Sequence, residues 1–331
     1  MKKSVTNNYH SKAHKLLKLT IFTCFCLLTL HSSAHAWAVS ATWESLANGS
    51  TACDGNTGSG EGLTDGCYDG RYTVSNTYAH SGTKSMRIYV KKGDANTGQP
   101  HFALPSPIYD GGEFWGRYYL YVPSGFDWTS EYITKLFRLV QSDSGGSGVG
   151  YVSILETKPG VYGCSGSDNW GYIVGGSEYT QGYYKWGGSY VCQTHGTVHF
   201  LTTGSWHQLE LYVKASSSGT GTFRIWHNGT LIWEKTNIQT IPSGGWLGDA
   251  SKTWSVNHFM GWWNQGGAVP TKDEYLYVDD FVYTNERPSN RDTYGNYMIG
   301  PIGSSGGTPS PAPSPAPSPL QPSPPSTIRI N

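Results

Sequence analysis

The sequence predicts an all-β protein, a β-sandwich of the jelly-roll type. Apolar residues alternate with polar or aromatic ones over many short stretches, which is typical of strands that bury one face. Helix signals are scarce, and glycine is frequent, with 43 in a chain of 331 residues. Many short strands joined by Gly/Ser turns in one long domain favour two packed sheets, and the concave sheet of a jelly roll can hold an extended polymer.

The first 36 residues have the order of a secretory signal peptide. Residues 1–18 carry five lysines and no acidic residue, residues 19–30 are almost wholly apolar, and Ala34 and Ala36 fit a small-x-small cleavage site. An apolar run of 12 residues is short for a membrane anchor, which is the alternative. We expect cleavage after Ala36 and a protein that is secreted, periplasmic or displayed at the cell surface.

Cleavage changes the charge of the chain. The 23 basic and 23 acidic residues balance, so the loss of five lysines leaves a net charge of −5. No global field then attracts nucleic acid or a polyanion, and a polyanion site requires a local basic patch. We expect a monomer without a nucleic-acid partner and, after cleavage, without a membrane anchor.

Four cysteines remain after cleavage, and an even number in an exported chain suggests disulfides. Of the three pairings we favour Cys53–Cys67 and Cys164–Cys192, because each closes a loop rich in Gly, Ser and Asp. Free buried thiols are the alternative.

Residues 306–331 are a Pro/Ser-rich low-complexity tail. From Thr308 onward the chain holds nine of its 18 prolines, which predicts an extended polyproline spacer. Residues 37–305 remain for one large β domain.

Within that domain, FWGRYYLYV at residues 114–122 reads as a strand with Trp115, Arg117, Tyr119 and Tyr121 on one face. Aromatic rings stack on a pyranose and arginine forks onto a carboxylate, so this face suits a sugar acid. An ordinary amphipathic strand with Arg stacked on Tyr is the alternative.

TKLFRLV, residues 134–140, is an apolar strand interrupted by Lys135 and Arg138. A charge there has to face a groove or find a partner. Because the two differ in parity, at most one faces the groove unless a bulge intervenes. Protection of an edge strand is the alternative.

Residues 204–234, GSWHQLELYVKASSSGTGTFRIWHNGTLIWE, read as three antiparallel strands with one wet face. Asn228-Gly229 is a type I′ turn signal. One face carries His207, Leu209, Leu211 and Val213, and the other carries Gln208, Glu210, Tyr212 and Lys214. Further on, HFMGWWNQGG offers rings and amides for sugar hydroxyls, with one of the two Trp expected in the core: Trp262, Trp263, Asn264 and Gln265.

Two patterns raise the question of a metal. The spacing of Cys192, His195 and His199 resembles a zinc site, but it falls in a Gly/Thr-rich strand and we expect no zinc. Alternation puts Asp280 inward with Val278 and Val282, where a carboxylate needs compensation. We expect a hydrogen-bonded structural Asp; a calcium ion with a ligand such as Glu44 is the alternative.

The absence of several catalytic motifs argues against some classes of enzyme. The sequence has no GxSxG elbow, no HExxH and no P-loop. No strand carries Glu-x-Asp-x-Glu, and retaining glycosidases need two carboxyl groups about 5 Å apart. A glycoside hydrolase is therefore a third hypothesis behind the two given below.

Several stretches together resemble the concanavalin-like jelly rolls of polysaccharide lyases, closest to the heparin-lyase-like and alginate/glucuronan-lyase groups. They cover about residues 82–292 and include GTKSMRIYV, EFWGRYYLYVPSGFDW, TKLFRLV and YLYVDDFVYTNERPSN. The resemblance implies a concanavalin-like fold and β-elimination at a uronic acid, without a required cofactor. Where the alginate type has Ser-x-Arg, this chain has Ser153 followed by Leu155.

The resemblance also implies site residues. Tyr119 would be the base, with Arg117 and Lys135 beside it to lower its pKa. Tyr172 and His199 are alternatives for the base, and Asn264 or Gln265 would bind the carboxylate. A lyase thus requires Arg117, Tyr119 and Lys135 to converge in one groove. A non-catalytic carbohydrate-binding module, the second hypothesis, requires only a groove of Trp and Tyr.

Overall fold

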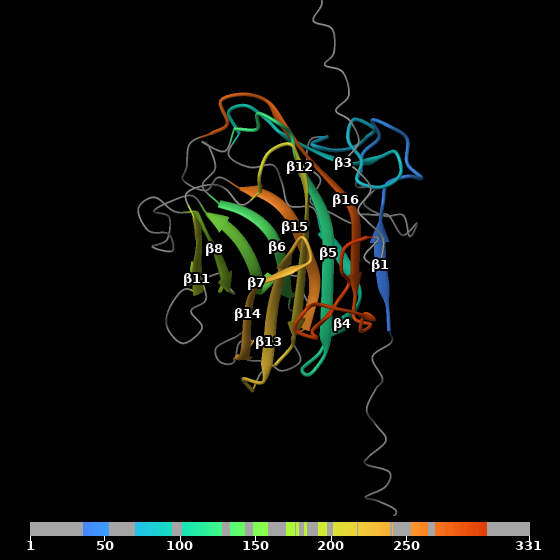
Figure 1. The fold of residues 1–331 in the computed structure, drawn as a ribbon. Coiled ribbons are helices and arrows are strands. Elements are labelled where there is room, and N and C mark those ends of the chain that lie inside the picture. Colours follow the sequence, from blue (N-terminus) through green and yellow to red (C-terminus); the bar gives the residue numbers. More distant parts are fainter. Residues whose placement is uncertain are drawn as a thin grey trace, which may run out of the picture. The chain divides into compact units, whose positions relative to one another are not determined.

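In the computed structural model the alternating segments form strands that pair into two large sheets (Figure 1). The structure describes residues 36–52, 70–94, 101–127, 133–142, 148–157, 170–175, 177–178, 182–183, 191–196, 201–216, 218–238, 240, 253–263 and 269–302. The chain divides into two units, residues 1–36 and 37–331, and all strands of the described residues belong to the second. No helix among the described residues is long and apolar enough to cross a membrane.

Sheet A has the order β14-β13-β12-β5-β16-β3-β2, with β1 beside β16. All of its pairings are antiparallel. Its strands are β1 (Ala38–Ala41), β2 (Tyr72–Ser75), β3 (Ser85–Val90), β5 (Glu113–Val122), β12 (Ser205–Lys214), β13 (Gly221–His227), β14 (Thr230–Ile238) and β16 (Glu274–Thr284).

Sheet B has the order β10-β9-β7-β6-β15-β4, with β8 beside β7 and β11 beside β8. Its strands are β4 (His101–Ile108), β6 (Ile133–Ser142), β7 (Gly148–Thr157), β8 (Trp170–Gly175), β9 (Ser177–Glu178), β10 (Gly182–Tyr183), β11 (Val191–Gly196) and β15 (Thr253–Trp263). For most of this sheet the backbone and its pairing are described; described side chains include Leu104, Ile108, Leu136 and Phe137.

The core lies between the two sheets. The Tyr118 hydroxyl of β5 donates to the Leu136 carbonyl of β6 at 2.7 Å, and the Tyr118 ring packs against Phe137 with 4.7 Å between centroids. Phe114 and Leu120, at even spacing from Tyr118, are also fully buried. Because these alternate residues of β5 contact sheet B, the intervening Trp115, Arg117, Tyr119 and Tyr121 occupy the opposite face, called here the outer face of sheet A. The predicted all-β sandwich is confirmed.

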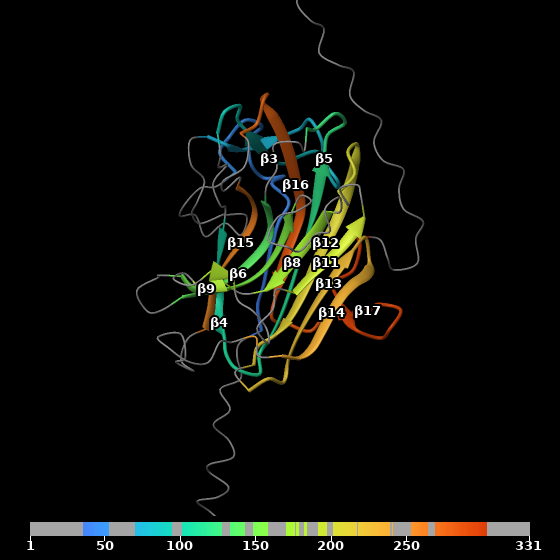
Figure 2. The same ribbon diagram turned by 90° about the vertical axis from the view of Figure 1, so that its left-hand side faces the viewer.

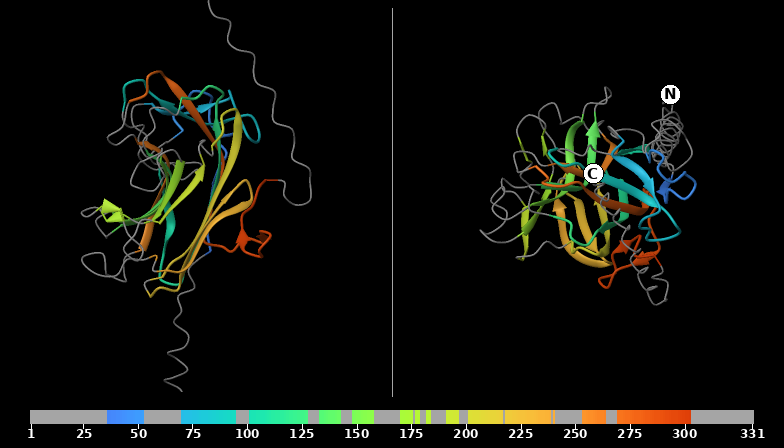
Figure 3. Two further views of the ribbon diagram at one scale, coloured as in Figure 1. Left: turned by 60° about the vertical axis from the view of Figure 1, so that its left-hand side comes forward. Right: turned by 90° about the horizontal axis from the view of Figure 1, so that it is seen from above.

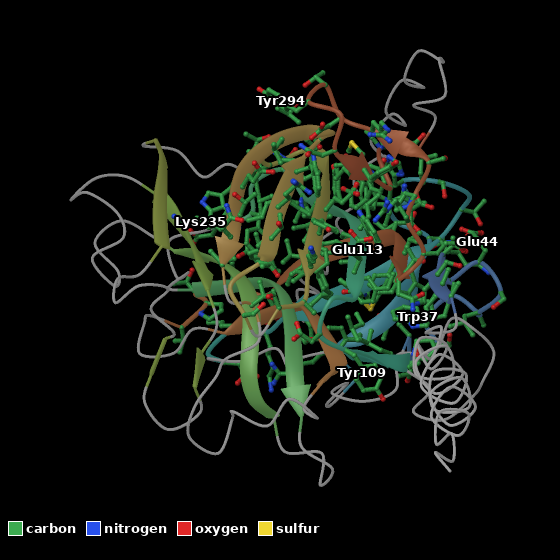
Figure 4. All side chains as sticks on the ribbon, turned by 90° about the horizontal axis from the view of Figure 1, so that it is seen from below. Trp37, Glu44, Tyr109, Glu113, Lys235 and Tyr294 are labelled. Carbon is green, nitrogen blue, oxygen red and sulfur yellow. The ribbon has the colours of Figure 1, made fainter. Side chains whose placement is uncertain are left out.

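The outer face of sheet A is partly covered by the C-terminal segment, residues 285–302. Figures 2 and 3 show this segment, in red, on the side of sheet A away from sheet B. It contains the short hairpin of β17 (Asn290–Arg291) and β18 (Tyr297–Met298). Tyr294 projects from the hairpin tip and is 75% exposed (Figure 4).

The three strands predicted for residues 204–234 are confirmed as β12, β13 and β14. Asn228 and Gly229 have φ values of 49° and 77°, as a type I′ turn requires. The predicted wet face is wrong at Gln208, Glu210 and Tyr212, which are all buried. The reason is that the C-terminal segment, distant in sequence, contacts Glu210 through Ile299 and Gly300 and packs with Tyr212 through Met298.

Strand β16 contains a bulge that the alternation pattern did not predict. Its register against β5 shifts between Asp279 and Val282, and Asp280 adopts a left-handed φ of 47°. Phe281 therefore enters the core, while Val282 is half-buried. The expectation that Asp280 and Val282 lie inward was wrong. Before the bulge β16 pairs with β3, and after it with β1.

Candidate functional site

A bulge in β6 brings Lys135 and Arg138 to one face of sheet B. In the pairing with β7, Lys135 lies opposite Leu155 and Arg138 lies opposite Ser153. Leu136 has no directly opposite residue on β7. Ser153 and Leu155 are two residues apart on a regular part of β7, so they share a face. Their partners Lys135 and Arg138 consequently share it as well.

That face is the one turned away from sheet A. Phe137 pairs with Ile154, the residue between Ser153 and Leu155, and Phe137 is fully buried against Tyr118 and Tyr283. Leu136 belongs to the same core. Alternation then places Lys135 and Arg138 on the outer face of sheet B. From the sequence, both charges were expected on one face only if a bulge intervened, and this bulge is present.

Two histidines extend this arrangement across neighbouring strands. Arg138 lies opposite His258 of β15, and His258 lies opposite His101 of β4. Directly paired residues are immediate neighbours across a ladder and share a face of the sheet. His101, His258 and Arg138 thus form a line across three strands, and together with Lys135 they are called the basic row. Neither histidine was predicted from the sequence, because a single His in an apolar strand gives no signal until its pairing is known.

The other half of the same face carries apolar positions. Leu155, opposite Lys135, is followed across the sheet by Ile173 of β8 and Cys192 of β11. Gly261 flanks Lys135 on the β15 side. The outer face of sheet B therefore joins a cationic half to an apolar half, a combination suited to a polymer with carboxylates and apolar ring faces.

Other predicted residues divide between the two faces of sheet B. Trp263 pairs with Ile133, on the face of Lys135, whereas Trp262 pairs with Thr134 on the opposite face. Tyr172 pairs with Glu156 and so also lies on the opposite face from Lys135. Outside the described residues lie His199, Asn264, Gln265, Cys53, Cys67 and Cys164.

The structure does not bring Arg117 and Tyr119 together with Lys135. Strand β5 belongs to sheet A and β6 to sheet B, and the outer faces of the two sheets are on opposite sides of the sandwich. The expected convergence of these three residues in one groove was wrong. The physical reason is that the chain crosses from one sheet to the other between two strands that are neighbours in sequence.

On the outer face of sheet A, Arg117 and Tyr119 bind the C-terminal segment instead. Arg117 Nη1 donates to the Gly300 carbonyl at 2.7 Å, and the Ile302 amide donates to the Tyr119 hydroxyl at 2.8 Å. Burial raises the pKa of the Tyr119 hydroxyl, with Arg117 opposing this only in part. A buried phenol with a raised pKa is a poor base.

Glu210 also binds the C-terminal segment, and Arg117, Tyr119 and Glu210 together are called the clamp. It lies directly opposite Arg117 in the sheet, and its carboxyl oxygens accept the amides of Ile299 at 2.5 Å and Gly300 at 2.9 Å. Burial raises the pKa of Glu210 to about 7, although both amides and the nearby Arg117 charge lower it. Trp115, expected to bind a ligand, is buried and donates from Nε1 to the Tyr297 carbonyl at 3.1 Å.

The carboxylates of Asp279 and Asp280 in β16 also form hydrogen bonds within the protein, to the turn that contains His80 and Ser81. Asp280 accepts from Ser81 Oγ at 2.5 Å and contacts His80 Nδ1 at 2.6 Å, while Asp279 accepts the His80 amide at 2.8 Å. Burial and the charge of Asp280 raise the pKa of Asp279 to about 8.

Glu44, the other residue considered for calcium, accepts the amides of Thr83 and Lys84 and the Thr83 hydroxyl. Glu44 and Asp280 thus both hydrogen-bond to the turn at residues 80–84. All four of their carboxylate oxygens already have partners within the protein, so this arrangement does not fit a bound cation. Within the described ranges no group of three or more His, Cys, Asp or Glu is placed to hold a metal ion.

Comparison with known proteins adds the following. A family model described as "Polysaccharide lyase" matches residues 41–281. Among solved structures, the chain is similar to the alginate lyase Aly36B, with 17% identity, a TM-score of 0.50, and coverage of 74% of this chain and 96% of that one. Among curated proteins none matches.

Two other similar structures are an endo-β-1,4-glucuronan lyase from the fungus Trichoderma reesei and an alginate lyase from Aplysia kurodai. The first has 13% identity, a TM-score of 0.45, and coverage of 64% of this chain and 85% of that one. The second has 13% identity, a TM-score of 0.48, and coverage of 76% and 99%.

Proposed function

Since this chain belongs to the polysaccharide lyase family, we propose that it cleaves a uronic-acid-containing polysaccharide by β-elimination on the outer face of sheet B. The observation that carries the proposal is the basic row. The pairing of β4, β15 and β6 aligns His101, His258 and Arg138, and the β6 bulge adds Lys135 to the same face. In a chain that would carry a net charge of −5 after signal cleavage, this is a local cationic site of the kind a polyanion requires.

The reaction needs a base, an acid and a cation. A base removes the proton from C5 of the uronate, the electrons form the C4–C5 double bond, and the C4–O bond breaks as its oxygen takes up a proton. Arg138 is suited to bind the carboxylate bidentately and to stabilise the charge that builds there. Histidine is the side chain best suited to act as a base near neutral pH, and His258, directly opposite, is the proposed base. Lys135 is the proposed donor to the leaving oxygen.

Ultraviolet absorbance tests this directly. The purified protein would be incubated with alginate, glucuronan, heparin, hyaluronan and pectate. We expect absorbance from the new conjugated double bond with at least one polymer. Lys135→Gln and His258→Gln should each lower the rate about 100-fold.

Lys235→Gln is the matched control, because Lys235 is an exposed lysine on β14 of the other sheet (Figure 4). New reducing ends without absorbance would indicate hydrolysis and overturn the proposal. Retardation in a polymer gel without any cleavage would favour the carbohydrate-binding module.

We also propose that the protein is exported and begins at Trp37. In support, Trp37 is buried, its amide donates to Asn285 Oδ1 at 2.7 Å, and its carbonyl accepts the Thr284 hydroxyl at 2.8 Å. Mass spectrometry of exported protein tests the cleavage site, and the same measurement with and without reductant tests the proposed Cys53–Cys67 and Cys164–Cys192 bridges. A mature mass that includes residues 1–36 would contradict export by cleavage.

A further inference from the structure

The outer face of sheet A has a second half that the C-terminal segment's clamp does not use. There the register lines up Trp206 of β12, Tyr121 of β5, Tyr277 of β16 and Arg87 of β3 as direct neighbours. These strands lie side by side in Figure 1. We call these four residues, with Tyr78, Tyr89 and Tyr275 beside them, the aromatic row.

The rings of the aromatic row contact one another. Tyr78 lies over Tyr121 with 4.4 Å between centroids and meets Tyr277 edge-on at 4.9 Å. Trp206 packs against Tyr121 at 5.3 Å. Tyr89 and Tyr275 stack at 5.2 Å with an interplanar angle of 22°. A sheet that fixes rings in this way presents them without a large cost in side-chain entropy on binding.

Most of these rings are accessible to solvent, unlike those under the C-terminal segment; Tyr277 is the exception and is 4% exposed. Tyr275 is 37% exposed, and Trp206, Tyr121, Tyr78 and Tyr89 are half-buried, whereas Trp115 and Trp226 are at most 1% exposed. Tyrosine and tryptophan that keep one edge wet combine apolar contact area with hydrogen-bonding rims. Such surfaces match the alternating C–H faces and hydroxyl edges of sugars.

Arg87 gives the aromatic row a charge. Its Nε donates to the Thr73 hydroxyl at 3.2 Å, and its guanidinium lies over the Tyr275 ring at 4.9 Å. No carboxylate of the described residues forms an ion pair with Arg87. A half-buried guanidinium held against aromatic rings without an acidic partner favours an anionic ligand.

We propose that the aromatic row is a second, non-catalytic binding surface for an acidic polysaccharide, on the opposite side of the sandwich from the basic row. From Trp206 to Arg87 the row crosses four strands, about 14 Å at ordinary strand spacing, enough for a short run of sugar rings. The choice of a uronate polymer rests on the proposed function; the existence of the surface rests on the described contacts of sheet A alone.

The test compares polymer binding with turnover of a short substrate. Tyr275→Ala, Arg87→Gln and Trp206→Ala would be measured by affinity electrophoresis in gels containing the uronate polymer, and by elimination rate on a short uronate oligosaccharide. We expect each variant to weaken polymer binding about tenfold, which corresponds to 1.4 kcal/mol, while the oligosaccharide rate stays unchanged.

Tyr109→Ala is the matched control, since Tyr109 is 55% exposed and lies outside the aromatic row (Figure 4). Unfolding by urea identifies any variant whose fold is damaged. Tyr275→Ala is the most informative, because its exposed ring can be removed with little loss of packing.

Three results would overturn the proposal. Unchanged polymer binding in all three variants excludes the surface. Equal binding of a neutral polymer such as xylan, unaffected by Arg87→Gln, excludes an acidic ligand. A dimer in sedimentation that Tyr275→Ala dissociates assigns the surface to a second copy of the chain. If no elimination is seen but the variants still weaken binding, the proposed function fails and the aromatic row stands.

Discussion

The two outer faces of this sandwich carry similar residues but use them differently. On sheet A, the cation Arg117 lies opposite the carboxyl of Glu210, and both bind the backbone of the C-terminal segment. On sheet B, the cation Arg138 lies opposite His258, and the row continues to His101. Arginine on an alternating strand therefore identifies an outer face, but only the cross-strand partner distinguishes a structural clamp from a candidate binding site.

The comparison is tested most strongly by Arg117→Ala. Arg117 is buried and donates to the Gly300 and Asp280 carbonyls. Its removal leaves both buried acceptors without this donor, and we expect the free energy of unfolding to fall by about 3 kcal/mol. At a temperature where the variant is still folded, kcat should be unchanged. Urea unfolding and elimination rates measure the two effects.

Arg224→Ala is the control for that variant, because Arg224 pairs with Glu234 in a partly exposed position on the same sheet and should cost less than about 1 kcal/mol. A stable Arg117→Ala protein without elimination activity would contradict the structural role of Arg117, since it would place the chemistry on sheet A.

The reverse pattern is expected for Arg138→Ala. Loss of charged hydrogen bonds to a carboxylate costs about 2 kcal/mol, so KM for the uronate polymer should rise about 30-fold, with Tm unchanged. Steady-state kinetics and thermal unfolding provide the readouts. Should Tm fall while KM stays constant, Arg138 would be a structural residue like Arg117.

The clamp on sheet A should also make stability depend on pH. Burial raises the pKa of Glu210 to about 7 and that of Asp279 to about 8. Between about pH 4 and pH 8 the folded protein therefore holds protons that the unfolded chain releases, and stability decreases as pH rises through this window.

We expect Tm to fall from pH 5 to pH 8, and Glu210→Gln to reduce the accompanying loss of unfolding free energy by roughly 3 kcal/mol. Glu286→Gln, at an exposed acid, should leave the slope as it is. A Tm that rises over this range would contradict destabilisation by ionisation of these two buried carboxyl groups.

The smallest effect is expected for Leu155→Arg, which places a cation directly opposite Lys135. Like charges at paired positions cost about 0.5 kcal/mol, so Tm should decrease slightly. The extra charge should lower KM for the uronate polymer about threefold. An unchanged KM, measured alongside Leu155→Gln, would show that the polymer does not reach this part of the face.

Much of the local structure was predictable from the sequence. The alternation in residues 114–122 correctly separated Tyr118 from Arg117, and Asn228-Gly229 gave the correct turn. What alternation cannot give is the assignment of a strand to a sheet. Residues 113–122 and 133–142 read as equivalent neighbours, yet they lie in different sheets.

The candidate site depended on two further non-local facts. The β6 bulge at Leu136 arises from pairing with β7 and reverses the parity of everything beyond it. His101 and His258 become neighbours only because β4 pairs with β15. The burial of Glu210 likewise comes from residues 299 and 300, so no pattern within β12 could predict it.

The clamp also has a mechanical consequence. Tension applied to the chain at Ile302 would reach the Tyr119 bond first, then those of Gly300, Ile299 and Tyr297, because these contacts follow one another along the segment. Bonds loaded in sequence peel open one after another, whereas strands pulled along their length share the load. Pulling on single molecules from this end should therefore record an early low-force release, before either sheet yields.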